Sequence, residues 1–189
     1  MKVIFCLLVV YSMKECTPEQ IEKLYDVAKE AQKKSYSPYS GFPVGSSVQF
    51  GNDKVFGGCN TENSAYTGTI CAERCAISAA FAKLGHEGIR KNPLKAVGVV
   101  SNAPGPIAPC GPCRQNIREL GKNIWICCFP NTGTKEKDLE TAKIHTLDYL
   151  LPMSFGPGDL GKDEFGEDEE EEEGDSDEKP SKSVRRVVK

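Results

Sequence analysis

Apolar positions recur at intervals of three and four residues in a segment that begins near Thr17. The residues Thr17–Gln20 combine a capping hydroxyl, a proline at the first helical position and a glutamine three residues after the cap, which together form a capping-box signature. The apolar positions that follow share one helical face, and they are Ile21, Leu24, Tyr25, Ala28 and Ala31. We predict an amphipathic helix up to about Lys34, because Ser37–Gly41 is rich in helix-breaking residues.

Four further apolar segments have the lengths and residue types of strands. Val44–Phe50 and Val55–Cys59 flank the turn-forming residues Gly51–Asp53, which predicts an antiparallel hairpin. Ala96–Val100 and Ile124–Phe129 are continuous apolar runs, typical of strands that are buried on both faces.

Helix-favouring segments separate these strands. An alanine-rich segment begins at Cys71 and predicts a helix that ends at Gly85. Cys113–Leu120 predicts a second helix, and Thr146–Leu151 a short third one. Helices that alternate with apolar strands predict an α/β sandwich in which helices cover both faces of the sheet.

Length and composition place this pattern in a single globular domain. The chain has 189 residues, of which 39% are hydrophobic and 27% charged, as is ordinary for soluble proteins. The formal charge of -3 is unevenly distributed, since Glu167–Glu173 is acidic throughout and Val184–Lys189 is basic. We predict one folded domain over residues 17–160 and a disordered tail over residues 161–189, acidic first and then basic.

The first residues form an apolar extension with two interpretations. Val3–Tyr11 resembles the start of a secretory signal, but it is too short to span a bilayer, which takes about 20 apolar residues. Lys14–Glu15 follows without a distinct cleavage site, and Met13 is an alternative start. We predict an extension over residues 1–16 and a cytoplasmic protein that does not bind membranes, with secretion as the alternative.

Nine cysteines in a chain of this size favour metal binding over a disulfide framework. Cys110 and Cys113 form a C-x-x-C pair at the start of a predicted helix, and Cys71 starts another, with Glu73 two residues later. The positive end of a helix dipole stabilises thiolates. Three thiolates leave one zinc position open, which is typical of catalytic sites. A C-x-x-C pair alone also occurs in redox proteins and zinc ribbons, so the pair by itself leaves these alternatives open.

The surroundings of these cysteines resemble the cytidine deaminase family. Cys71–Arg74 and Pro109–Gln115 match the two zinc signatures of that family. The resemblance covers about residues 17–160, and its other matching segments are Phe42–Gly45, Asn60–Asn63 and Leu150–Pro157. It implies a three-layer α-β-α sandwich with a mixed sheet.

The resemblance also implies a reaction. Cys71, Cys110 and Cys113 would hold one zinc ion per subunit, and Glu73 would move protons from the attacking water to the pyrimidine N3 and to the leaving ammonia. Cytidine and deoxycytidine would become uridine and deoxyuridine, as in pyrimidine salvage. Two residues would support the thiolates by hydrogen bonds, namely Arg74 and Gln115.

Residues that bind the substrate are implied in the same way. Asn60 and Glu62 match the residues that hold the ribose hydroxyls, and Phe42 matches an aromatic residue that packs on the base. Small members of the family are homotetramers with shared active sites, to which Tyr66 and Phe155 would contribute from a neighbouring subunit. The implied substrate-binding residues are therefore Phe42, Asn60, Glu62, Tyr66, Ala72 and Phe155.

Functions from other classes compete with this interpretation. A nucleic-acid-editing deaminase needs a basic, aromatic-lined channel that the sequence does not show, and Glu62 near the sugar would repel a phosphate. A non-enzymatic, zinc-stabilised binding protein would have no use for Glu73. Deaminases of other aminopyrimidines share the zinc signatures, so the reaction is better specified than the substrate. We expect a free pyrimidine nucleoside as the substrate and no nucleic-acid partner.

The remaining candidates receive structural interpretations. Ser46–Ser47, Cys75 and Pro112 depart from the usual family pattern, but none of them removes a metal ligand. Four cysteines are predicted to be small buried hydrophobes, namely Cys59, Cys75, Cys127 and Cys128. Neither His86 nor His145 lies in a pattern that predicts catalysis.

Overall fold

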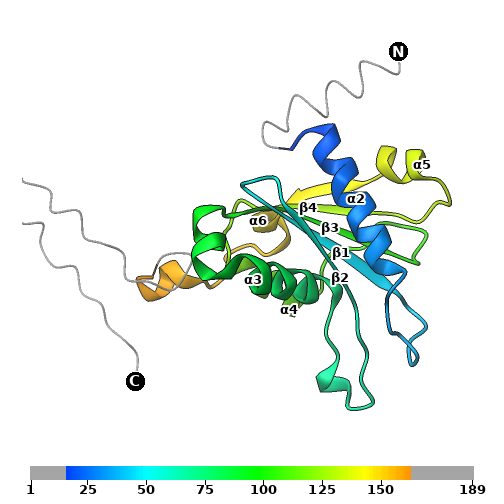
Figure 1. Cartoon of the computed structure of the whole chain (residues 1–189), viewed down its shortest axis with the longest axis horizontal. Helices are drawn as coiled ribbons and strands as arrows, with labels where there is room; N and C mark the ends of the chain where they lie inside the picture. The colour runs from blue at the N-terminus through cyan, green and yellow to red at the C-terminus, as the bar shows by residue number, and fades with distance from the viewer. Residues whose placement is uncertain (1–15, 163–189) are drawn as a thin grey trace, which may run out of the picture.

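The structure, a computed structural model, describes residues 16–162. Within this range a five-stranded sheet lies between two layers of helices, which confirms the predicted sandwich (Figure 1). Apart from its last residue, the predicted extension over residues 1–16 lies outside the described residues, and so does the predicted tail beyond residue 162. The strands are β1 (Val44–Phe50), β2 (Val55–Cys59), β3 (Leu94–Ser101), β4 (Trp125–Phe129) and β5 (Lys143–Thr146).

The sheet is mixed, as predicted. Its strand order is β2-β1-β3-β4-β5, and β3 and β4 are parallel while all other neighbours are antiparallel. Val48 of β1 lies opposite Phe56 of β2 on one side and Val97 of β3 on the other. Parallel strands need a long crossover connection, so the chain between β3 and β4 returns across one face of the sheet. That connection carries one of the two helices of the candidate site.

Helices cover both faces of the sheet (Figure 1). Residues of β3 alternate between two cores, because successive side chains of a strand point to opposite faces. Val97 and Val99 belong to one core, and Ala96 and Val100 belong to the other. The face of Ala96 is covered by α2 (Pro18–Gln32) and α5 (Lys135–Glu140), and the face of Val97 by α3 (Ala72–Lys91), α4 (Gly111–Arg118) and α6 (Leu147–Leu150).

The strongest local predictions are confirmed. Thr17 caps α2, and both hydrogen bonds of the capping box with Gln20 are present. The helix ends slightly earlier than predicted, at Gln32. The hairpin strands β1 and β2 have the predicted bounds. Among residues 16–162, no helix is long and apolar enough to cross a membrane.

Three elements differ from the prediction. Gly85 has a φ of 67°, which interrupts α3, but the prediction that the helix ends there is wrong because a further helical segment continues to Lys91. The apolar pattern did not predict α5 or β5. Both are short, and between them they contain a single buried residue, Asp138, which is polar.

Asp138 of α5 accepts three hydrogen bonds, one from Tyr25 of α2 and two from Thr132 in the loop before α5. Its carboxylate receives the hydroxyl of Tyr25 at 2.9 Å and both the backbone N–H and the hydroxyl of Thr132 at 2.7 Å each. Burial opposes ionisation of Asp138, but the hydrogen bonds from Thr132 and Tyr25 outweigh it and hold the pKa of Asp138 below its ordinary value. Burial, with help from Asp138, raises the pKa of Tyr25 to about 12. The Asp138 carboxylate therefore stabilises the folded state at neutral pH.

Asp138→Asn should lower the free energy of unfolding at neutral pH by about 1–3 kcal/mol, because the amide has one acceptor oxygen in place of two for the donors of Tyr25 and Thr132. The pKa of Asp138 is lowered in the folded state, so its contribution is present above the ordinary aspartate pKa of about 3.9 and is lost as the pH falls through the folded value. The difference in the free energy of unfolding between the parent and Asp138→Asn should therefore shrink in acid. Denaturant unfolding at equal protein concentration measures it, with the exposed Asp148→Asn as the control. A gap that stays constant with pH would contradict this role.

Candidate active site

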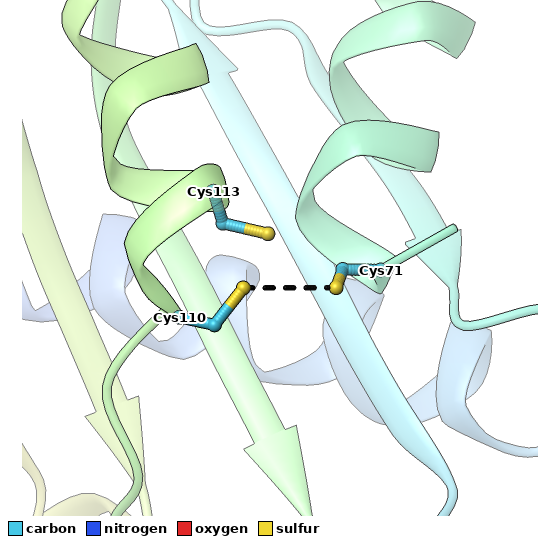
Figure 2. Close-up of side chains that lie close together, drawn as sticks. All are labelled: Cys71, Cys110 and Cys113. Carbon is cyan, nitrogen blue, oxygen red and sulfur yellow. Dashed lines mark hydrogen bonds between the residues drawn. The ribbon is translucent and has the colours of Figure 1, made fainter. Parts of the chain in front are cut away.

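The candidate site lies where the starts of α3 and α4 face each other (Figure 2). Cys71 is the N-cap residue of α3, Cys110 is the N-cap residue of α4, and Cys113 lies in the first turn of α4. Neither capping side chain bonds to the backbone of its own helix. All three sulfur atoms are therefore directed toward one another at the positive ends of two helix dipoles.

The spacing of the sulfur atoms fits a tetrahedral metal ion. All three lie within 4.8 Å of one another, and the sulfurs of Cys71 and Cys110 are 3.8 Å apart. A zinc–thiolate bond is about 2.3 Å long, and tetrahedral geometry then places two ligand sulfurs about 3.8 Å apart. The three cysteines thus form a three-thiolate site that leaves one coordination position for another ligand.

Hydrogen bonds among the three cysteines shift the pKa values of Cys71 and Cys113. Hydrogen bonds from Cys113 and Cys110, together with the guanidinium of Arg74, lower the pKa of Cys71 to about 5 although its burial opposes this. The hydrogen bond to Cys71 and burial raise the pKa of Cys113. The lowered pKa of Cys71 favours its thiolate, which is the form that ligates metals.

Glu73 lies beside the cluster but is not part of it. It belongs to the first turn of α3, and its side chain is buried. Burial raises the pKa of Glu73, and the negative charge of Cys71 adds to this effect. A raised pKa suits a carboxyl group to taking up and releasing protons.

Close backbone packing holds the start of α3 against the sheet. A Cβ atom at Gly58 of β2 would overlap the carbonyl oxygen of Ala72 and the amide of Ala76. Ala72 and Ala76 are themselves completely buried. The small residues of β2 and α3 therefore fix the position of Cys71 and Glu73 relative to the sheet.

Arg74 contacts the cluster, whereas Gln115 has a different described partner. The guanidinium of Arg74 donates to the carbonyl of Thr69 at 3.1 Å, and its positive charge interacts favourably with the sulfurs of the cluster, above all that of Cys71. The side-chain amide of Gln115 donates to the carbonyl of Phe155 at 3.0 Å. Support of the thiolates by Gln115 stays a prediction.

Glu62 lines a hollow of about 370 Å³ together with Tyr39, Ser40, Tyr66 and Thr69. Its carboxylate accepts the backbone N–H groups of Tyr39 at 2.8 Å and Ser40 at 3.1 Å, and also the hydroxyl of Ser40. These bonds, above all the one from the Ser40 hydroxyl, lower the pKa of Glu62. Glu62 is therefore a fixed negative charge at neutral pH.

A larger hollow lies elsewhere. Its volume is about 470 Å³, and it lies between α2 and β2, with Val27, Ala31 and Cys59 among its lining residues. None of the predicted site residues lines it. The smaller hollow is the better candidate for substrate binding, because Glu62 and Tyr66 both line it.

Asn60 organises the loop that carries Phe42. Its side-chain oxygen accepts hydrogen bonds from Ser35 at 2.6 Å and from the amide of Val44 at 2.8 Å, and its amide donates to the carbonyl of Phe42 at 3.0 Å. Asn60 is almost completely buried, while the Phe42 ring is partly exposed. Within one chain, Asn60 thus positions Phe42.

Two predicted site residues are strongly exposed. Tyr66 is 79% exposed and Phe155 is 59% exposed. The ring of Tyr66 contacts that of Tyr39 edge to face, with the centroids 6.3 Å apart. Tyr39 and Ser40, which hold Glu62, were not among the predicted site residues. The sequence indicated only that they belong to a helix-breaking segment, although the backbone N–H groups of such turns are available to bind a carboxylate.

The other described cysteines are separate from the cluster. Cys127 and Cys128 are buried, as predicted, whereas Cys59 and Cys75 are only half-buried. The prediction of full burial for the latter two is therefore wrong. Cys59 lies near the exposed edge of the sheet, because β2 is an edge strand. No disulfide is present among residues 16–162.

Comparison with known families agrees with this geometry. The family model described as "Cytidine and deoxycytidylate deaminase zinc-binding region" matches residues 18–128. The chain belongs to this family. Zinc is the metal of the family's signature region, and the three clustered sulfurs of this deaminase domain fit it.

Curated relatives and solved structures span the described domain. The cytidine deaminase of Sporosarcina psychrophila is 39% identical over 140 residues, which cover 74% of this chain and 94% of the relative. That of Halalkalibacterium halodurans is 34% identical over 143 residues, which cover 74% of this chain and 96% of the relative. The crystal structure of cytidine deaminase from Burkholderia pseudomallei superimposes with a TM-score of 0.60 at 37% identity and covers 70% of this chain and 97% of that chain.

Substitutions at Cys110 and Glu73 should affect the bound metal differently. Cys110→Ala removes a ligand, so zinc content and thermal stability should both fall, since metal binding contributes to folding stability. Glu73→Ala should retain about one zinc ion per subunit, because Glu73 is not in the cluster. Metal analysis and thermal unfolding of the purified proteins measure this, with Cys59→Ala as a cysteine control. Zinc loss from all three variants would show that the cluster is not the specific site.

Proposed function

We propose that this chain catalyses the zinc-dependent hydrolytic deamination of cytidine and deoxycytidine to uridine and deoxyuridine, with release of ammonia. The observation that carries the proposal is the buried Glu73 beside three clustered cysteine sulfurs, because Glu73 lies next to the ligand set without belonging to it. A structural metal site does not need such a carboxylate. The names of the relatives, all cytidine deaminases, support the same reaction.

Glu73 is the proton carrier in this proposal. Zinc, when held by the three cysteines, lowers the pKa of water so that a nucleophile is available at neutral pH. Glu73 accepts a proton from the attacking water and donates it to N3 of the pyrimidine. It then takes the proton of the oxygen newly bonded to C4 and delivers it to the amino group, so that the C4–N bond breaks, ammonia leaves and a carbonyl forms at C4. The raised pKa of Glu73 assists both transfers, because a carboxyl group with a pKa nearer neutrality exchanges protons more readily.

Glu62 is proposed to select a free nucleoside. A carboxylate has about four lone-pair positions, and Tyr39 and Ser40 occupy three of those of Glu62. One acceptor position remains for a ribose hydroxyl. The negative charge of Glu62 repels a phosphate on the same sugar, so nucleotides and polynucleotides are disfavoured. Asn60, Phe42 and Ala72 are proposed to complete this binding site.

The assembly is proposed to be a homotetramer with shared sites. Tyr66 and Phe155 are large aromatic residues with exposed rings, and an exposed aromatic residue is well suited to contact a neighbouring subunit.

The catalytic domain is proposed to span residues 17–160. We also propose a cytoplasmic location, because all eight described cysteines are free and a reducing compartment keeps thiols in that form. Entry of a full-length fluorescent fusion into the secretory pathway would contradict that location.

Turnover should be restricted to free nucleosides. We expect ammonia release from cytidine and deoxycytidine, and little or none from cytidine monophosphate or from a cytosine-containing oligonucleotide. In the same assay Glu73→Ala should lower turnover about 10²- to 10⁴-fold, the usual contribution of a positioned acid–base group. Comparable turnover of the oligonucleotide would favour a nucleic-acid-editing enzyme, and parental turnover by Glu73→Ala would end the proposed mechanism.

Mixing two impaired variants tests the shared sites. If Phe155 acts in a neighbour's site, tetramers assembled from Phe155→Ala and Glu73→Ala chains contain some sites with both residues intact. Co-refolding the two variants should therefore restore part of the activity that each lacks, and light scattering should give a tetramer. Activity equal to the mean of the two separate variants, or a fully active monomer, would refute shared sites.

A further inference from the structure

One face of α4 holds the segment that carries Phe155. Arg114 donates to the carbonyl of Leu150 at 2.8 Å, and Gln115 donates to the carbonyl of Phe155 at 3.0 Å. Arg118 donates from Nε to the hydroxyl of Ser154 at 3.0 Å. The same helix starts at Cys110 and carries Cys113 in its first turn. A short helix thus connects two of the metal ligands to residues 150–156.

Arg118 is the deepest of these contacts. It is 4% exposed, and burial of a guanidinium costs free energy unless polar groups compensate it. Its charged end lies flat against the backbone of Gly156, where a Cβ atom would overlap Cζ and both terminal nitrogens. Gly156 has an extended backbone with a φ of -159°, so glycine is needed there for the close approach and not for its conformation. Arg118 and Gly156 are therefore fitted to each other.

The backbone around Phe155 is fixed while its ring is exposed. Gly156 donates its N–H to the carboxylate of Asp159 at 2.7 Å, which caps the short 3-10 helix η2 (Pro157–Leu160). Ser154 on the other side is held by Arg118, and the carbonyl of Phe155 itself is held by Gln115. Phe155 is nevertheless 59% exposed, so much of it does not pack against its own chain.

We propose that Arg118 is a positioning residue for substrate binding. Through Ser154 and Gly156 it fixes the direction in which the ring of Phe155 is presented, and it contacts neither the cysteine cluster nor the substrate. The inference rests on the proposed role of Phe155 at the nucleoside site. It assigns Arg118, Ser154 and Gly156 a part in substrate affinity that a purely structural core contact would not have.

Three variants weaken the contact of Arg118 with Ser154 and Gly156, one by changing Arg118 and two by changing its partners. Arg118→Lys keeps the positive charge but cannot form the same Nε bond, Ser154→Ala removes the acceptor, and Gly156→Ala forces the guanidinium away. Each should raise the KM for cytidine by about 5- to 30-fold, the effect of one or two lost contacts, while kcat and zinc content change little. Ser154→Thr keeps the hydroxyl and should restore the parental KM. Asn116→Ala on the exposed side of α4 is the matched control.

Hydrogen exchange of backbone amides tests the positioning without relying on catalysis. The amides of residues 151–159 should exchange faster in Arg118→Lys and Ser154→Ala than in the parent, whereas those of the rest of α4 should not. Unchanged exchange would overturn the inference even if KM rises. Ser154→Ala removes only one half-buried hydroxyl, so it keeps the test decisive if Arg118→Lys does not fold.

A double-mutant cycle with Phe155→Ala separates this inference from the proposed function. If Arg118 acts through the ring, then Ser154→Ala should raise KM in the parent but add almost nothing in the Phe155→Ala background. Full additivity would show that Arg118 and Ser154 act independently of Phe155 and would overturn the inference. An unchanged KM in Phe155→Ala alone would refute the proposed role of Phe155 and, with it, the inference. If amide exchange were still faster in Ser154→Ala, the positioning of the backbone by Arg118 would stand, and the error would lie in the role of the Phe155 ring.

Discussion

Cys71 and Cys110 are 39 positions apart along the chain, yet their sulfur atoms lie 3.8 Å from each other. This proximity requires the starts of α3 and α4 to remain adjacent on one face of the sheet. Gly58 allows α3 to pack directly on β2, and the crossover between β3 and β4 returns α4 to the same face. Because clustered thiolates repel one another without a cation, metal binding and the packing of these two helices stabilise each other.

The charges around the cluster are arranged by burial and by short hydrogen bonds. Arg74 offsets part of the negative charge that three thiolates bring, while the buried Glu73 has a raised pKa. The pKa of Glu62 is shifted in the opposite direction, because a hydroxyl and two backbone N–H donors stabilise its ionised form. The opposite pKa shifts of these two carboxyl groups suit the different roles proposed for them, proton exchange for Glu73 and sugar binding for Glu62.

The helix α4 joins the metal site to the surface of the domain. Its first turn carries Cys113, and its last residue, Arg118, is buried against the segment that presents Phe155. A rigid element of this kind transmits the position of one end to the other, since buried polar groups cannot move without losing their partners. The proposed sharing of sites between subunits would then depend on the same helix that holds two of the zinc ligands.

Local patterns in the sequence were sufficient to predict those features whose interactions join residues close together along the chain. The capping box of Thr17 and Gln20, the hairpin of β1 and β2, and the Cys110–Cys113 pair at a helix start all depend on residues a few positions apart. Their spacing therefore predicted these elements, the alternation of helices with apolar strands predicted the sandwich, and the resemblance to the family implied that Cys71 joins the Cys110–Cys113 pair. Only the tertiary structure could show that Asp138 anchors α5, that Asn60 holds Phe42, and that Arg118 lies beneath Gly156. These partners lie far apart along the chain, and a polar residue's type and neighbours do not specify which distant donor or acceptor it meets when it is buried.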